Sequence, residues 1–201
     1  MKLIKLFTIV FFIFSTYAIG ETKEYTQNLK KAFAGFVMPE AWETSHAPFR
    51  VIGNLYGVGG QDLSVYLVTS GEGHILINTA PAGSLKDISA NIESLGFSID
   101  DVKVLLTMQS HFDHTADLAL IKELTGAKMY ATEKDAPILE DGGVSDPHFG
   151  GFETFRPVKV DKIIKDGEII SVGTTKLTVH YHPGHTAVSY THLTLPTNRE
   201  V

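Results

Sequence analysis

The sequence predicts one domain of the α/β class. Short apolar runs typical of buried strands alternate with segments of helical periodicity in the middle of the chain, and glycine-punctuated strand pairs lie before and after this region. The composition agrees with a single soluble globular domain, since 43% of the 201 residues are hydrophobic and 20% are charged. We find no internal repeat and no linker in the sequence.

The first 20 residues have the pattern of a secretory signal. Two basic residues, Lys2 and Lys5, precede an apolar run over 6–14 and the small-residue site Ala18-Ile19-Gly20, after which we expect cleavage. The run is too short for a membrane span, and no cysteine follows to carry a lipid or form a disulfide. We therefore expect an exported, periplasmic protein with no stable membrane anchor.

The charge balance disfavours one class of partner. The chain has 17 Lys and Arg against 23 Asp and Glu, a net charge of −6, and it contains no basic run. Nucleic-acid binding needs a basic surface, so we expect no nucleic-acid partner.

Strand signals begin at Phe49 and continue to a helix. The extended runs are 49–53, 55–58, 63–68 and 74–78, the last two joined by a glycine turn at 70–73 as a hairpin. Residues 84–87 match a capping box. The helix that follows has Leu85, Ile88, Ile92 and Leu95 on one face and ends at Gly96.

The second half of the chain continues the alternation. A strand at 102–106 precedes a helix with apolar positions at Leu118, Ile121 and Leu124, and a strand at 128–131 precedes a short helix capped from Thr132. A long glycine-rich loop covers 141–151, and loops of this length are often functional. The remaining predicted strands are 162–164, 168–172 and 176–181.

Two polar clusters each follow a predicted strand. The first contains Gln109, His111, Asp113 and His114, and the second is the turn 182–186 with His185. Open α/β sheets place ligands at the carboxyl ends of their strands, and imidazole and carboxylate suit zinc. Because structural zinc sites usually contain thiolates and this chain has no cysteine, a catalytic site with open positions fits better. The simpler alternative for the first cluster is a polar loop with Asp113 as a helix cap.

These clusters resemble those of the metallo-β-lactamase superfamily, whose pattern is His-x-His-x-Asp-His followed later by Pro-Gly-His. The resemblance covers about residues 42–186 and includes the stretches 47–56, 75–79 and 182–186. Those stretches are most similar to the exported subclass B3 β-lactamases, particularly the glutamine variant, in which the first histidine of the motif is replaced. The resemblance implies an αββα sandwich of two similar halves, with zinc at the seam.

The resemblance also implies a ligand set for one or two Zn²⁺ ions. Gln109, His111 and His185 would bind the first ion, and Asp113 and His114 would bind the second. It implies hydrolysis of the β-lactam ring, with Asp113 as the catalytic residue that orients the nucleophile. Two departures stand out: the Gln109 amide is a weaker donor than imidazole, and Asn78 replaces a common strand-end aspartate. An enzyme that works with the second zinc alone is compatible with the Gln109 departure.

Other candidate residues have weaker signals. His46, His74, His148 and His180 have no ligand pattern around them and are interpreted as structural or surface residues, and we expect His182 to shape its turn. Phe149 and Phe152 fit either a substrate wall or the hydrophobic core.

The last 14 residues do not resemble the family. Residues 188–201 are interpreted as a sequencing adapter translated in frame, with a natural strand and turn as the alternative. The metallo-β-lactamase domain at 21–187 is then incomplete, holding the first half of the sandwich and the start of the second. We expect such a chain to be inactive, because the second zinc keeps two protein ligands and one face of the sheet lacks its partner layer.

Three functions remain open on the sequence alone. The leading one is a zinc-dependent β-lactamase, expected to be monomeric and to act on a small-molecule β-lactam, thereby conferring antibiotic resistance. A thioesterase of the glyoxalase II type or a lactonase has the same scaffold, because fold does not determine substrate. The third is a metal-binding fragment without activity.

Overall fold

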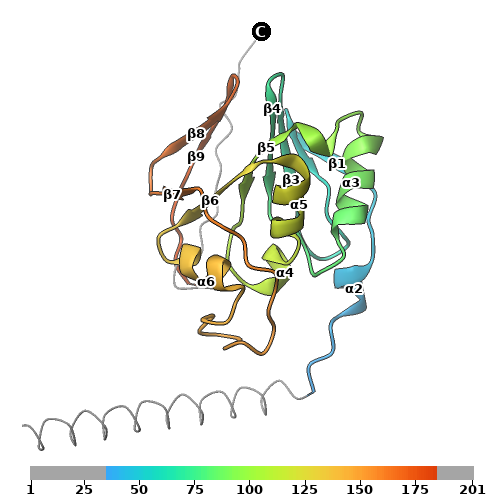
Figure 1. The fold of residues 1–201 in the computed structure, drawn as a ribbon. Coiled ribbons are helices and arrows are strands. Elements are labelled where there is room, and N and C mark those ends of the chain that lie inside the picture. Colours follow the sequence, from blue (N-terminus) through green and yellow to red (C-terminus); the bar gives the residue numbers. More distant parts are fainter. Residues whose placement is uncertain (1–34, 185–201) are drawn as a thin grey trace, which may run out of the picture.

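The computed structural model describes residues 35–184, which form one large sheet with helices on one side (Figure 1). The sheet has the order β1-β2-β3-β4-β5-β6-β7, antiparallel from β1 to β4 and parallel from β4 to β7. Its strands are β1 (Phe49–Ile52), β2 (Leu55–Gly57), β3 (Tyr66–Ser70), β4 (Gly73–Ile77), β5 (Val102–Leu106), β6 (Lys128–Thr132) and β7 (Lys162–Ile164). The predicted α/β class is confirmed.

Helical crossovers connect the parallel strands, as parallel pairing requires. The helices are α2 (Glu40–Glu43), α3 (Leu85–Ser94), the 3₁₀ turn η1 (Ile99–Asp101), α4 (Phe112–Thr115), α5 (Leu118–Thr125) and α6 (Asp135–Asp141). α3 and η1 link β4 to β5, α4 and α5 link β5 to β6, and α6 with a long loop links β6 to β7. The carboxyl ends of β4, β5 and β6 therefore lie at the same edge of the sheet.

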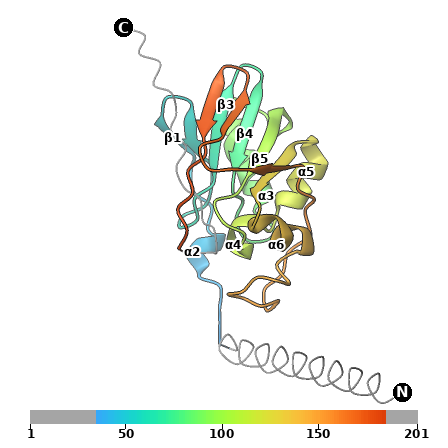
Figure 2. The same cartoon turned by 90° about the vertical axis from the view of Figure 1, so that its left-hand side faces the viewer.

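Both faces of the sheet are apolar and buried, because alternate residues of each strand point to opposite sides. On one face, Leu67, Leu76 and Leu105 pack with Ile88 and Ile92 of α3. On the other face, the core includes residues of the hairpin formed by β8 (Ile169–Val172) and β9 (Thr175–Thr178). Figures 1 and 2 show the helices and this hairpin on opposite sides of the sheet.

The hairpin corrects one expectation about the sheet. Val68, Ile75 and Ile77 are buried in the core that contains β8 and β9, so the central strands do not lack a partner layer. Exposed apolar side chains lie instead on the edge strand β1, where Phe49 is 51% exposed and Ile52 is 62% exposed.

Two other expectations change at element ends. The strand expected over 63–68 begins only at Tyr66. The helical periodicity predicts Leu124 on the buried face of its helix, but it lies in the last turn of α5 and is 55% exposed. Among residues 35–184, no helix is long and apolar enough to cross a membrane. The expected signal at 1–20, His185 and the expected adapter at 188–201 lie outside the described residues.

The start of α3 is capped from a distant part of the chain. Ser84 has helical dihedral angles and makes no side-chain cap, contrary to the capping-box prediction. Instead, the buried Asp117 carboxylate accepts hydrogen bonds from the Leu85 N–H at 2.8 Å, the Gly83 N–H at 3.0 Å and the Ser84 hydroxyl at 3.1 Å. Because Asp117 directly follows the turn that carries His114, this cap joins α3 to the polar loop after β5.

Replacing Asp117 with alanine is expected to destabilise the protein by about 2–4 kcal/mol, since it removes a buried, charged acceptor and leaves the backbone donors at the start of α3 without it. Urea unfolding of the metal-free, full-length protein measures the effect. Asp87→Ala is the matched control, because Asp87 is an exposed carboxylate in the first turn of the same helix. Equal losses for the two variants would contradict the capping role of Asp117.

Candidate metal centre

Asn78 holds the beginning of the polar loop that follows β5. Its side-chain oxygen accepts hydrogen bonds from the Met108 N–H at 2.7 Å and the Thr107 hydroxyl at 3.3 Å, and its amide donates to the Ser64 carbonyl at 3.0 Å. Asn78 has a φ of 65°, a left-handed conformation that asparagine tolerates better than most residues. The sequence identified Asn78 only as a departure, and the structure makes it a support of the loop.

The two histidines and the carboxylate of the motif lie on one helical turn. His111 is the N-cap residue of α4, and its carbonyl accepts a hydrogen bond from the Thr115 hydroxyl at 2.8 Å. Asp113 and His114 lie inside α4, and Nε2 of His114 is 3.4 Å from Oδ2 of Asp113. The alternative of Asp113 as the helix cap is therefore wrong, because His111 holds that position.

Gln109 has the environment expected of a metal ligand. The residue is 8% exposed, and its side-chain oxygen is buried without a hydrogen-bond partner among residues 35–184. Burying an acceptor in this way costs about 1–3 kcal/mol unless something else satisfies it. A cation at this oxygen would do so, and the neighbouring imidazoles and carboxylate are donors that suit zinc. By their chemistry, the donors of this segment therefore suit a zinc ion.

The glycine-rich loop between α6 and β7 packs against His111. Nε2 of His111 lies 3.7 Å from Oδ2 of Asp146, and its ring is stacked on that of His148 at 5.4 Å and meets Phe149 edge-on at 5.0 Å. Phe149 also contacts Phe112 at 5.2 Å and is 9% exposed, so it packs inwards. His148 is exposed as predicted, but its place beside His111 was not foreseen from its sequence context.

The buried carboxylate of Asp135 holds the loop that follows β5 through a hydrogen bond to Ser110. Asp135 accepts hydrogen bonds from the hydroxyls of Ser110 at 2.9 Å and Thr132 at 2.7 Å. Burial raises the pKa of Asp135 above its usual value; the two hydroxyl hydrogen bonds oppose this shift, and the charge of Asp146 adds to it. The sequence indicated the Thr132–Asp135 pair as a helix start but not its link to Ser110, which lies between two motif residues.

Aromatic side chains before β1 also pack on the motif helix. The ring of Phe112 lies 6.3 Å from that of Phe36 and 6.5 Å from that of Trp42. The segment that carries these two residues is thus in contact with α4, which the sequence did not predict.

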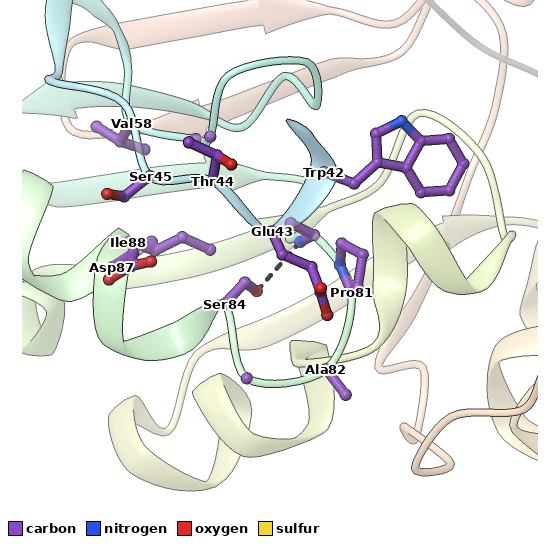
Figure 3. Close-up of a pocket in the computed structure, with 14 residues that line it drawn as sticks. Trp42, Glu43, Thr44, Ser45, Val58, Pro81, Ala82, Ser84, Asp87 and Ile88 are labelled. Atoms are coloured by element: carbon purple, nitrogen blue, oxygen red, sulfur yellow. Dashed lines mark hydrogen bonds between the residues drawn. The ribbon is translucent and has the colours of Figure 1, made fainter. Parts of the chain in front are cut away.

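A cavity of about 210 Å³ lies beside this segment, between α2 and the start of α3 (Figure 3). Trp42, Glu43 and Thr44 line one side, and the loop 80–84 with Asp87 lines the other. None of the predicted zinc ligands lines this cavity.

The other histidines do not extend the centre within the described part of the chain. His74 is 6% exposed and packs edge-on against Phe97 at 5.2 Å, which confirms a structural role. His46 and His182 are exposed, and His180 is half-buried. Over 35–184, no three His, Asp or Glu side chains come close enough together to hold a metal ion. Gln109, His111, Asp113 and His114 lie on one short segment of the chain. His185 lies outside the described residues.

Comparison with known proteins places these observations in a family. Residues 58–194 match the model of the metallo-beta-lactamase superfamily. The chain is 45% identical to the metallo-beta-lactamase GOB-18 from Elizabethkingia meningoseptica, with a TM-score of 0.75, covering 77% of this chain and 58% of that one. It is 43% identical to a beta-lactamase from Chitinophaga pinensis, with a TM-score of 0.75, covering 78% of this chain and 59% of that one.

A third similar structure is the class B3 di-zinc metallo-beta-lactamase LRA-12 from an Alaskan soil metagenome. The identity is 45% and the TM-score is 0.74, over 77% of this chain and 59% of that one. The chain therefore spans 58–59% of the length of these three enzymes.

Proposed function

Because the chain belongs to the metallo-β-lactamase superfamily, we propose that the full-length protein containing it is a zinc-dependent hydrolase that opens the β-lactam ring of antibiotics. The observation that carries the proposal is the buried, unpartnered oxygen of Gln109 on the same short loop as His111, Asp113 and His114. The similarity to a class B3 di-zinc enzyme supports the same metal.

The proposed ligands are divided between two ions. Gln109, His111 and His185 bind the first, and Asp113 and His114 bind the second. Zinc, when bound, polarises a carbonyl and lowers the pKa of water to about 7. The charged oxygens of Asp113 orient the water that attacks the substrate carbonyl, and they accept its proton. The lactam C–N bond then breaks, and the proton passes to the departing nitrogen. The Gln109 amide is a neutral and weaker donor, so the first ion is held less tightly than it would be by a third imidazole.

The supporting residues determine where these side chains lie. Asn78 anchors the start of the loop by hydrogen bonds with Met108 and Thr107, and Asp135 holds Ser110 by a hydrogen bond. Side chains held in fixed positions orient the substrate more accurately, which lowers the entropic part of the barrier. We further propose that the protein acts in the periplasm after removal of residues 1–20.

The experiment that tests the function is a substrate panel with the zinc-loaded, full-length protein. We expect ring opening of a cephalosporin or a carbapenem, measured by the loss of the β-lactam absorbance. The expected kcat/KM is at least about 10⁴ M⁻¹s⁻¹, the lower range for enzymes. A thioester and a lactone at the same concentrations serve as controls. Turnover of a control substrate without ring opening of any β-lactam would contradict the proposal and favour another hydrolase of this superfamily.

A further inference from the structure

We propose that Asp146 is a positioning residue for the metal site: its carboxylate accepts a hydrogen bond from Nε2 of His111 and thereby reserves Nδ1 of that ring for zinc. The inference rests on the proposed function, in which His111 is a zinc ligand. It assigns a role to a residue of the glycine-rich loop that belongs to neither histidine cluster.

The first support is the burial of the pair. Oδ2 of Asp146 lies 3.7 Å from Nε2 of His111, and the two side chains are only 2% and 5% exposed. A carboxylate removed from water needs a donor or a positive partner nearby, and this imidazole is such a partner. The separation is that of an ion pair and is longer than a hydrogen bond, so we expect it to shorten when zinc orients the ring.

The second support is that Asp146 is held in place without the help of His111. Its Oδ1 accepts hydrogen bonds from the backbone N–H groups of His148 at 2.7 Å and Phe149 at 3.3 Å. Its own backbone bonds to Gly143 at 3.2 Å and Gly150 at 2.7 Å. One carboxylate oxygen is therefore used by the loop, and the other remains directed to the imidazole.

The third support is the packing around the ring. Phe149 meets the His111 ring edge-on, and His148 is stacked on it, so the two residues whose N–H groups bond to Asp146 also contact the same imidazole. A ring confined in this way can rotate little. Its orientation is therefore determined by the loop and by the carboxylate at Nε2.

The chemical consequence concerns the tautomer. A neutral imidazole carries one proton, and a carboxylate beside Nε2 favours the tautomer with the proton on that nitrogen. In this tautomer Nδ1 carries the lone pair of the ring, which is what a metal ligand needs. Carboxylates in this arrangement also make the imidazole a stronger donor.

The first test measures zinc affinity in the full-length protein by competition with a chromophoric chelator. Asp146→Asn keeps an oxygen for the two backbone N–H groups but places an NH₂ group against Nε2–H. We expect Asp146→Asn to raise the Kd of one zinc ion by about 10–100-fold. This ion is the one bound by His111, and it is identified by its loss in His111→Ala. Asp141→Asn is the matched control, because Asp141 accepts a hydrogen bond from the Ser145 N–H on the same loop, and its Kd should not change.

The second test does not depend on any variant folding. Long-range ¹H–¹⁵N spectra of the zinc-loaded, histidine-labelled protein report which nitrogen of His111 carries a proton. We expect a protonated Nε2 and a metal-bound Nδ1. A metal-bound Nε2 would overturn the inference, and so would an unchanged Kd in Asp146→Asn when His111→Ala loses its zinc. If His111→Ala keeps all of its zinc at the original affinity, the proposed function itself fails.

Discussion

Removing zinc from the full-length protein is expected to abolish β-lactam hydrolysis, with a fall in kcat/KM of about 1000-fold or more. The ion supplies several kcal/mol of charge stabilisation in the transition state, and each 1.36 kcal/mol corresponds to a tenfold change in rate. The described motif offers Gln109, Asp113 and two imidazoles to metal, and we see in it no arrangement for a covalent intermediate. The measurement is hydrolysis of a chromogenic cephalosporin before and after exhaustive treatment with EDTA.

Restoring the activity provides the control for this experiment. Addition of zinc to the chelated protein should recover the original rate, whereas addition of magnesium, which prefers oxygen ligands in octahedral geometry, should not. Activity that survives complete chelation and is lost to a serine-directed inhibitor would rule out a metal-dependent reaction.

Asp113→Ala is expected to be more damaging than Gln109→Ala in the zinc-loaded, full-length protein. We expect a loss of kcat/KM of about 10²–10⁴-fold for Asp113→Ala, because the residue both binds metal and handles a proton of the nucleophile. For Gln109→Ala we expect about tenfold, which corresponds to one neutral interaction of about 1.5 kcal/mol. Steady-state kinetics with parallel zinc analysis separate loss of the ion from loss of chemistry.

Two neighbouring exposed residues provide matched controls for these variants. Asp62→Ala and Gln61→Ala make the same chemical changes at exposed positions of the loop between β2 and β3, and both should leave kcat/KM unchanged. An equal or larger loss for Gln109→Ala than for Asp113→Ala would show that the first zinc carries the reaction.

The hydrogen-bond supports of the motif could not be predicted from the sequence, whereas its metal ligands are a prediction that rests on the resemblance to the family. His111, Asp113 and His114 lie close together in the chain after an apolar strand, and this pattern predicts a metal site at the end of β5. Asp135 and Asp146 come 21 and 32 residues after His114, and nothing in their local sequence connects them to that loop. Their contacts with Ser110 and His111 arise because α6 and the glycine-rich loop, which follow β6, pack against the segment that follows β5.

The corrected helix cap has the same explanation. Ser84 fits the local pattern of a cap, but the Asp117 carboxylate, 32 residues beyond Leu85, reaches the helix N-terminus and has the stronger charge-assisted interaction. A local sequence pattern records which residues can cap a helix and contains no information on competitors from elsewhere in the chain. Leu124 is a second example, since helical periodicity predicts it on the apolar face and its side chain is exposed.

By itself the sequence determined the α/β class and the order of strands and helices, because these depend on periodicity and on spacing within short segments. It also predicted the residues of the metal motif, through their resemblance to the family pattern. Only the tertiary structure decided that Asn78, Asp135 and Asp146 hold the motif loop, and that β8 and β9 cover the second face of the sheet. These relations are contacts between segments distant in sequence, and they exist only after the sheet has brought the ends of its strands together.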